Sequence, residues 1–565
     1  MKTMECDLLV IGSGAGGLSA AVSAAHRGMK VIVAEKEPVF GGTTARSGGW
    51  SWIPMNGPAK RAGVSDSVEA AREYLQGEAG EHFDPARVDA FLEAGPKAVD
   101  FFEEKTALQF DLGPTFADYH PKAPGGVDGG RSIVARPFDG RELGEEIKRL
   151  RPPLAEITFL GMMIGTGKEL LHFFNVLRSP VSAFYVAILF FKYLRDLVFH
   201  GRPMRLMNGN ALVARLAKSA FDKGVEIWTR SPVARLIEED GRVVGAELHT
   251  ETGAVTVRAV KGVVLAAGGF PQDPVRRKAL FGHAASGHEH ASPAPPGNTG
   301  DGLRLGESMG GAVNDALPNA AAWVPISRPV RRDGTLGTFP HFVDRSKPGV
   351  IAVTRSGRRF CNEADSYHDF GQSLTQRIAE EGGEICAFFM CDHRAIRRYG
   401  LGHVKPAPVP MTRALETGYL LKGSSIRRLA KAMGADAAAL EETVARYNEA
   451  AERGEDPEFG RGETAYNRSL GDPDWTPNPC VAPLKDGPFY AVKVVMGDLG
   501  TFAGLKTDEY ARVLGDGRAP IPGLYAAGND AASIMGGAYP GGGITIGPAL
   551  TFGWIAARHM SGAND

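Results

Sequence analysis

The 565-residue sequence has few cysteines and almost no net charge, and it contains no long uninterrupted apolar run. Its five cysteines form neither a dense disulfide pattern nor a paired metal-ligand motif, so we predict free thiols and no metal. The formal charge of -1 excludes the global basic field that nucleic-acid-binding proteins use. Acids stand near the N-terminus where a secretory signal would have basic and then apolar residues, so we expect a cytoplasmic protein.

Glycine, in contrast, is abundant. The chain has 73 glycines and a hydrophobic content of 43%, which indicates a folded protein with many tight turns and close backbone approaches. Its length exceeds that of an average domain several-fold, so two or more structural units are expected.

A nucleotide-binding pattern opens the chain. An apolar run (Cys6–Ile11) leads into a glycine series, a helix-like segment follows, and a second apolar run (Lys30–Ala34) ends at an acid. This order of strand, glycine turn, helix, strand and acid is typical of a Rossmann-like dinucleotide site, in which the turn receives the pyrophosphate and the acid receives the ribose. The predicted contacts here are Gly12, Gly14, Ala15, Gly16, Gly17, Glu35 and Lys36.

A second glycine-rich loop, Gly41–Gly49, follows soon after that acid. It resembles the flavin-binding segment of the succinate dehydrogenase and fumarate reductase flavoproteins, which implies FAD rather than NAD. Some of those proteins attach their flavin through a histidine in this segment, and this loop has none, so we predict non-covalent FAD. The predicted contacts from this loop are Gly42, Thr43, Thr44, Ser47, Gly48 and Gly49.

Distant segments are expected to complete this unit. Asp240-Gly241 between two alternating runs predicts a β-hairpin, and buried strands are predicted at Gly262–Ala267 and before Gly528. Ile544–His559 reads as a helix whose N-terminus would face the flavin ring and favour the anionic reduced form. The predicted contacts are Val233, Ala267, Gly268, Gly528, Asn529, Ile544 and Ile546.

Two longer motifs make the resemblance specific. Thr44–Gly49 with Trp52-Ile53-Pro54 near the front, and Tyr539–Gly543 with Thr545–Ala549 near the end, are similar to the signatures of 3-ketosteroid Δ1-dehydrogenases. Gly357–Glu363 extends the likeness through most of the chain. The resemblance implies an α/β fold with an α+β cap, FAD, and removal of two hydrogens from ring carbons beside a ketone.

The resemblance also implies roles for single residues. Tyr539 and the backbone N–H of Gly543 would bind the substrate's carbonyl oxygen and stabilise enolate charge. Tyr367 would take the proton from the neighbouring carbon, assisted by Tyr119. The hydride would leave for the flavin, and an external electron acceptor of the quinone or dye type would reoxidise it.

One departure leaves the substrate open. Members of that family carry two tyrosines before the sequence that here is Gly471-Asp472-Pro473, whereas this chain has Ser469-Leu470. The first hypothesis is 1,2-dehydrogenation of a 3-ketosteroid, and the alternative is a smaller cyclic ketone such as cyclohexanone. A fumarate-type reductase is a weaker alternative, because that superfamily places an arginine where this chain reads Gly537–Pro540.

Residues 158–200 are unusually apolar and carry an excess of basic side chains. The richest part is too short to span a bilayer, so we predict no transmembrane segment. Two alternatives stay open: peripheral contact with the inner face of the membrane, or a helical hairpin that covers the active site or a subunit interface.

These observations predict a discontinuous Rossmann-like FAD domain made of residues 1–145, 205–290 and 487–565. A helical insertion (146–204) and a smaller catalytic domain (291–486) complete the architecture, with the active site between the two domains.

Overall fold

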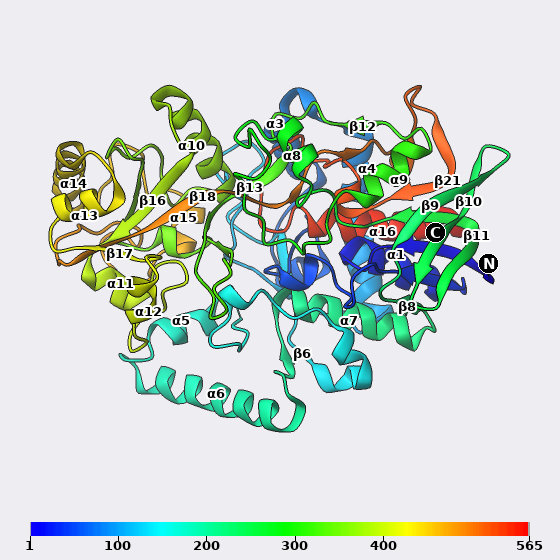
Figure 1. Cartoon of the computed structure of the whole chain (residues 1–565), viewed down its shortest axis with the longest axis horizontal. Helices are drawn as coiled ribbons and strands as arrows, with labels where there is room; N and C mark the ends of the chain where they lie inside the picture. The colour runs from blue at the N-terminus through cyan, green and yellow to red at the C-terminus, as the bar shows by residue number, and fades with distance from the viewer. Residues whose placement is uncertain (1, 166, 563–565) are drawn as a thin grey trace.

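The computed structural model describes residues 2–165 and 167–562. Figure 1 shows the whole chain. Its largest sheet has eight strands in the order β20-β21-β11-β1-β2-β8, with β10 and β9 continuing from β11. The five central strands, from β21 to β8, run parallel. The strands are β1 (Lys2–Ile11), β2 (Val31–Ala34), β8 (Glu226–Trp228), β9 (Val233–Glu239), β10 (Arg242–Thr250), β11 (Gly253–Leu265), β20 (Arg512–Leu514) and β21 (Pro520–Ala526).

The structure contains the buried first strand and the tight hairpin that the sequence predicts for this sheet. The second half of β1 is buried, as a central strand covered on both faces requires. Asp240 and Gly241 have φ values of 50° and 75°, the left-handed pair that a tight hairpin between β9 and β10 needs. Helix α1 (Ala15–His26) packs against α16 (Ile546–Ser561), so the two ends of the chain share one core.

A second, six-stranded antiparallel sheet forms the other half of the molecule, with the order β14-β13-β18-β16-β15 and β17 beside β18. Its strands are β13 (Ala321–Ser327), β14 (Phe339–Pro340), β15 (Val350–Val353), β16 (Cys386–Cys391), β17 (Leu421–Gly423) and β18 (Phe489–Thr501). Helix α10 (Tyr367–Glu381) packs on β13, while α13 (Ile426–Met433) and α14 (Ala437–Ala451) lie together at the far end (Figure 1).

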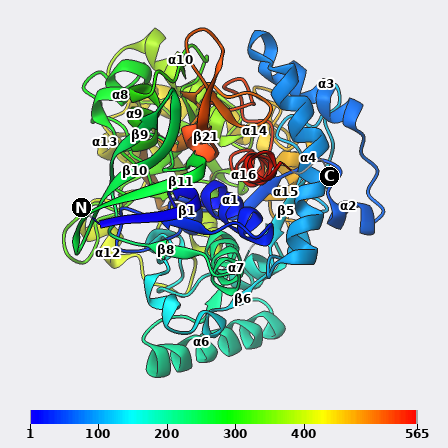
Figure 2. The same cartoon turned by 90° about the vertical axis from the view of Figure 1, so that its right-hand side faces the viewer.

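A smaller layer flanks the first sheet. Strands β3 (Trp50–Trp52), β5 (Ser132–Ala135) and β4 (Phe110–Leu112) form an antiparallel sheet. Helix α4 (Pro85–Lys105) packs against α16, and α3 (Val68–Ala79) packs on α4 (Figure 2). On the opposite flank, α7 (Asn208–Asp222) packs against α1.

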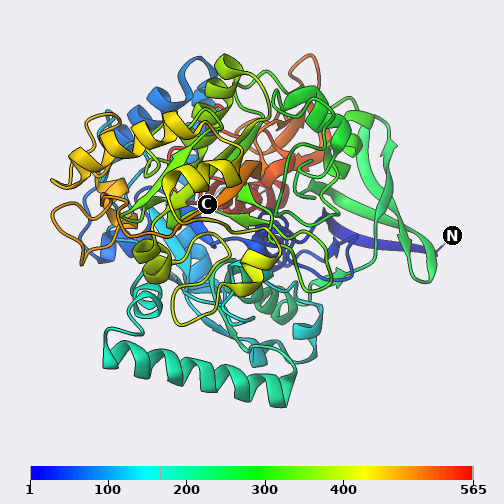
Figure 3. The same cartoon turned by 60° about the vertical axis from the view of Figure 1, so that its left-hand side comes forward.

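The apolar insertion forms α5 (Lys168–Phe174) and the long helix α6 (Pro180–His200). In all three views of the chain α6 lies along the outside, most clearly in Figure 3. It is not packed over the centre of the molecule. Among the described residues, no helix combines the length and the hydropathy needed to cross a bilayer.

The predicted α/β class with a Rossmann-like sheet is confirmed. Strands of that sheet come from three separate stretches of chain. The domain limits stay a proposal. Because β18 pairs with β13 and β16, we propose that the first unit resumes after Thr501 rather than at residue 487.

Candidate active site

The glycine turn after β1 meets the acid at the end of β2. Glu35 accepts hydrogen bonds from the Ser13 backbone N–H at 3.3 Å and the Ser13 hydroxyl at 2.5 Å. The Ser13 hydroxyl in turn accepts the Gly41 N–H at 2.9 Å, which ties the first glycine turn to the second. Glu35 is buried, and burial raises the pKa of its carboxyl. A buried acid beside backbone donors is suited to receive sugar hydroxyls.

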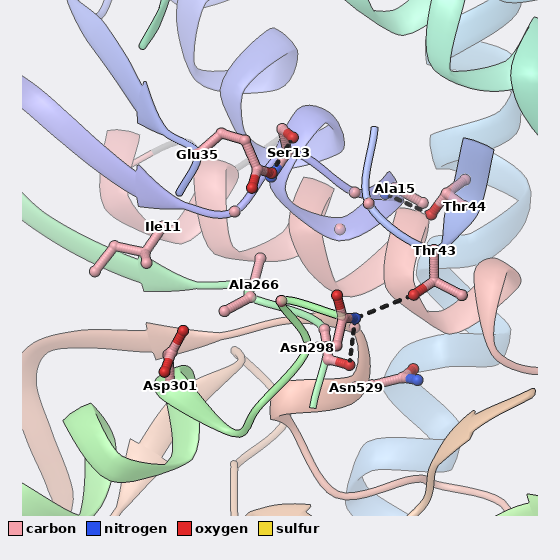
Figure 4. Close-up of a pocket in the computed structure, with 18 of the residues that line it drawn as sticks. Ile11, Ser13, Ala15, Glu35, Thr43, Thr44, Ala266, Asn298, Asp301 and Asn529 are labelled. Atoms are coloured by element: carbon pink, nitrogen blue, oxygen red, sulfur yellow. Dashed lines mark hydrogen bonds between the residues drawn. The ribbon is translucent and has the colours of Figure 1, made fainter. Parts of the chain in front are cut away.

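The second loop closes over the start of α1. The Ala15 N–H donates to the Thr44 hydroxyl at 3.0 Å. The Asn298 side-chain amide donates to the Thr43 hydroxyl at 3.0 Å and to the Gly268 carbonyl at 3.2 Å (Figure 4). Three segments that are far apart in sequence therefore surround one space.

That space is a cavity of about 1060 Å³, including its open mouth. Most of the predicted contacts line it: Gly12, Gly14, Ala15, Gly16, Glu35, Lys36, Gly42, Thr43, Thr44, Ser47, Val233, Ala267, Gly268, Gly528, Asn529 and Ile546. The volume and the mixed lining are those of a small-molecule or cofactor site.

Four predicted contacts lie elsewhere. Gly17 packs on the backbone of Gly12, and Gly49 packs on the start of α7. Ile544 lines a neighbouring smaller cavity. Gly48 does not line the main cavity either. These four positions support the walls of the site or flank it, and no alternation or spacing in the sequence separates such supporting glycines from the ones that face the ligand.

Sequence reasoning also missed lining residues, among them Ser13, Arg151, Asn298 and Asp301. Arg151 is buried, and two of its guanidinium nitrogens, Nε and Nη2, have no hydrogen-bond partner in the described part of the chain. Nη2 lies 3.8 Å from a Glu37 carboxylate oxygen, too far for a hydrogen bond. A buried guanidinium that lines a cavity and has unused donors fits a phosphate or another polar group of a dinucleotide. The residues present therefore fit FAD.

Gly12 offers a direct test of this fit. Its φ is 105°, and an added Cβ would lie 2.1 Å from the Ala266 carbonyl oxygen. We predict that Gly12→Ala is recovered without yellow flavin, because the turn must move away from the position that binds the cofactor. Absorbance at the flavin band against total protein measures the loss. Gly28→Ala is the matched control, since Gly28 has φ 82° but open space around its Cβ. Equal flavin content in both variants would contradict the prediction.

Four tyrosines meet between the two sheets. The Tyr119 hydroxyl donates to the Tyr367 hydroxyl at 2.8 Å. The ring of Tyr539 stacks on Tyr119 with centroids 5.4 Å apart and lies 5.0 Å from Tyr367. Tyr466, which the sequence did not single out, packs on Tyr119 at 4.4 Å. We call Tyr119, Tyr367, Tyr466 and Tyr539 the tyrosine cluster.

Burial governs the chemistry of this cluster. All four tyrosines are buried, and desolvation raises the pKa of each phenol above its usual value. Two features oppose this effect. Tyr367 is the first residue of α10, where the helix dipole favours negative charge. Hydrogen bonds with Tyr367 lower the pKa of Tyr119 and of Tyr539 in part, whereas the hydrogen bond with Tyr119 raises the pKa of Tyr367.

The loop that carries Tyr539 and Gly543 rests on the predicted front motif. The Trp52 N–H donates to the Gly543 carbonyl at 3.1 Å, and the Ser132 hydroxyl donates to the Gly542 carbonyl at 2.9 Å. Gly543 has φ 106° and no room for a side chain. Its own N–H donates no hydrogen bond to any residue that the structure describes. The two sequence motifs are thus neighbours in space and leave one backbone donor free.

His120 links the segments that hold the first two tyrosines. Its ring nitrogens lie 2.8 Å from carboxylate oxygens of Glu78 and Asp369. Burial lowers the pKa of His120, but hydrogen bonds and charge from Asp369 and Glu78 outweigh it and raise the pKa to about 10. The charged ring therefore holds the Tyr119 loop against the start of α10.

Fold and cavity together define a dinucleotide-dependent oxidoreductase of the flavin type. The family model described as an FAD binding domain matches residues 7–546. The chain is 43% identical to a 4-oxocyclohex-2-ene-1-carboxylate 5-dehydrogenase of Sinomonas cyclohexanicum, over 99% of this chain and 94% of the relative. It is 38% identical to a 3-oxosteroid 1-dehydrogenase of Mycobacterium tuberculosis, over 99% of both chains.

Among solved structures, a 3-ketosteroid Δ1-dehydrogenase from Sterolibacterium denitrificans in complex with 1,4-androstadiene-3,17-dione superposes with a TM-score of 0.90 and 34% identity, covering 99% of each chain. The chain belongs to the 3-ketosteroid Δ1-dehydrogenase family of FAD-binding flavoproteins. The predicted family and cofactor are confirmed, and non-covalent attachment of the flavin stays a prediction.

Proposed function

We propose that this chain is an FAD-dependent dehydrogenase that desaturates a cyclic ketone beside its carbonyl group, and that the ketone is a 3-ketosteroid desaturated between carbons 1 and 2. The observation that carries the proposal is the hydrogen-bonded pair Tyr119–Tyr367 beside Tyr539 and the free N–H of Gly543. A base and two oxyanion donors in one buried place suit proton abstraction next to a carbonyl.

Each member of the site then has a distinct task. Tyr539 and the Gly543 N–H bind the ketone oxygen, which acidifies the neighbouring carbon and stabilises the enolate. Tyr367 removes the proton, with Tyr119 sharing the charge through their hydrogen bond. Bound FAD supplies a hydride acceptor for the adjacent carbon. An external acceptor of the quinone type restores the oxidised enzyme.

A smaller cyclic ketone is the second candidate. Ser469 and Leu470 stand where the resemblance implies two tyrosines, and the Leu470 carbonyl accepts a hydrogen bond from Lys347 at 2.8 Å. The relative that is 43% identical is named for a six-membered ring ketone. Loss of aromatic lining removes surface on which a large flat substrate would rest.

Product analysis separates the two candidates. The enzyme would be incubated with a dye acceptor and either androst-4-ene-3,17-dione, cyclohexanone or 4-oxocyclohexanecarboxylate. We expect a steroid product lighter by two hydrogens, found by mass spectrometry. Turnover of a small ketone alone would support the desaturation reaction but identify the small ketone as the substrate. Turnover of neither class would contradict the proposed function.

We further propose that α6 rests on the inner face of an anionic membrane. Its outward side exposes Val181 (71%), Phe184 (69%), Phe191 (71%) and Val198 (79%). Its inward side packs Tyr193 against Met162 and Phe173. Exposed basic residues, including Arg178 and Lys192, flank the apolar stripe. An apolar helix face bordered by lysine and arginine suits the boundary between acyl chains and anionic headgroups.

Vesicle binding tests this surface. We expect Val181→Ser with Val198→Ser to weaken sedimentation with phosphatidylglycerol vesicles about tenfold or more, because two exposed apolar side chains leave the interface. Val260→Ser with Val275→Ser is the matched control, since these valines are also exposed (55% and 76%) but lie outside the insertion. Equal binding by both double variants would rule out the surface. A change of oligomeric state in the first variant alone would assign α6 to a subunit interface.

A further inference from the structure

A buried arginine stands behind the tyrosine cluster without a carboxylate of its own. The side chain of Arg345 is 0% exposed, and no ion pair joins it to any described acid. Its guanidinium donates to the backbone carbonyls of Glu363, at 2.5 Å, and Asp365. Both of these bonds come from Nη1. Another guanidinium nitrogen, Nε, has no hydrogen-bond partner in the described part of the chain.

The acids around Arg345 are paired with other groups. Glu363 accepts from Arg359 at 2.8 Å and from Arg461 at 2.9 Å. Asp365 accepts from the Asn467 amide at 2.9 Å, and Asp369 lies 2.8 Å from the His120 ring. A buried cation is costly unless a negative group compensates it. No carboxylate accepts a hydrogen bond from Arg345 in the described part of the chain, although its charge acts on two nearby acids, where it lowers the pKa of Asp344 and opposes the raised pKa of Asp365.

The groups that Arg345 faces are phenols. Its Nη2 donates to the Tyr466 hydroxyl at 3.2 Å, and its guanidinium carbon lies 5.8 Å from the centroid of the Tyr367 ring. Tyr466 packs on Tyr119, whose hydroxyl donates to that of Tyr367. Two hydrogen bonds, joined by the ring contact between Tyr466 and Tyr119, thus lead from the guanidinium to the residue proposed as the base.

The segment that presents Arg345 is held firmly. Arg461 donates to the Arg345 carbonyl at 2.9 Å and to the Lys347 carbonyl at 3.0 Å. Since Arg461 is itself paired with Glu363, the ion-pair network fixes the place of Arg345 without neutralising its charge.

We propose that Arg345 is a positioning residue that, through the Tyr466 hydroxyl, favours negative charge on the tyrosine cluster and so prepares Tyr367 to take a proton. This inference rests on the proposed function. In the step, the bond from the α-carbon to hydrogen breaks, its electron pair enters the enolate, and the Tyr367 phenolate becomes a hydroxyl. The proton that the resting cluster lost beforehand goes to solvent.

The charge of Arg345 acts on Tyr119 and Tyr466, whereas burial, the neighbouring phenols and the hydrogen bond with Tyr119 raise the pKa of Tyr367. Burial raises the pKa of Tyr119 and of Tyr466, whereas the charge of Arg345 lowers both. Other ionisable groups face the cluster or Arg345 and must be held constant in a comparison. Besides the four tyrosines and Arg345 they are His120, Asp344, Cys361, Glu363, Asp365, His368 and Asp369.

The test is the pH dependence of flavin reduction in Tyr466→Phe, which removes only the hydroxyl. We expect the midpoint of the ascending limb to rise by about one pH unit, so that the rate near neutral pH falls about tenfold while the alkaline plateau and KM stay close to the wild type. Arg345→Lys, which keeps a cation, should shift the midpoint less than Arg345→Gln. A purely structural role would lower the plateau or change KM without moving the midpoint.

A second measurement needs no substrate. Tyrosinate absorbance of the resting holoenzyme is titrated in the wild type, in Tyr466→Phe and in Tyr447→Phe. Tyr447 is buried and its hydroxyl has no partner in the described chain, so it is the matched control. The inference is supported if the tyrosinate signal that appears at the lowest pH in the wild type is lost in Tyr466→Phe but not in Tyr447→Phe. An unchanged titration together with an unmoved midpoint overturns it. If no ketone reduces the flavin, the proposed function fails, and the titration still decides the role of Arg345.

Discussion

Replacing Tyr367 by phenylalanine is expected to slow flavin reduction by the ketone about 100-fold or more, because the reaction loses its base. Phenylalanine keeps the ring that packs against Phe342 and Tyr539, so the fold and the bound flavin should remain. Stopped-flow absorbance under anaerobic conditions measures the rate of reduction directly, without the reoxidation step.

Tyr447→Phe is the control for this prediction as well. It removes a buried hydroxyl from α14, outside the tyrosine cluster, and we expect a rate close to that of the wild type. If Tyr367→Phe reduced its flavin as fast as Tyr447→Phe, another group would have to be the base. A loss of bound flavin in Tyr367→Phe would instead assign the residue a structural task.

The second large effect is on stability. Glu363 is fully buried between two arginines, and it lies four residues before Tyr367. Glu363→Gln removes the negative charge and leaves the Arg461 guanidinium without its ion-pair partner. Breaking one side of a buried ion pair costs about 3 to 5 kcal/mol. We expect the free energy of unfolding at neutral pH to fall by that order, as measured by denaturant titration.

The destabilisation caused by Glu363→Gln should depend on pH. The charges of Arg359 and Arg461 hold the pKa of Glu363 at about 2, below the usual 4.5. A depressed pKa stabilises the folded state above pH 4.5, and this stabilisation disappears as the pH falls through 2. The difference between wild type and Glu363→Gln should therefore shrink on acidification below pH 4.5.

The matched control is Glu384→Gln, which also removes a carboxylate that pairs with two cations, Arg355 and Lys493. Glu384 is half-exposed, so water screens its charge. The free energy of unfolding should therefore change by no more than about 1 kcal/mol. Equal destabilisation by the two substitutions would show that burial does not determine how much the Glu363 ion pairs contribute to the free energy of unfolding.

Local signals made the nucleotide half of the fold predictable. The turn at Gly12, the acid at Glu35 and the hairpin at Asp240-Gly241 are each defined by a few consecutive residues, and all three have the predicted form. The long motif around Tyr539 was recognised by its resemblance to a family signature, and the structure shows that Gly541, Gly542 and Gly543 have no room for a side chain.

Contacts between distant segments could not be predicted in the same way. Asn298 reaches the flavin cavity from a proline-rich loop, and Tyr466 reaches Tyr119 across more than half of the chain. Arg345 has no local pattern that marks it as buried. Such positions depend on how the two sheets meet, and single-sequence periodicity carries no information about that packing.

The proposed function requires that a cyclic ketone reduces the flavin of this enzyme by a hydride while its α-proton goes to Tyr367. The most direct measurement is anaerobic mixing of the oxidised holoenzyme with androst-4-ene-3,17-dione, with succinate as a control, while the flavin absorbance is followed. We expect rapid bleaching by the steroid and none by succinate. If neither the steroid nor cyclohexanone, tested in the same way, bleached the flavin, the proposed function would be contradicted, whether or not succinate reacts.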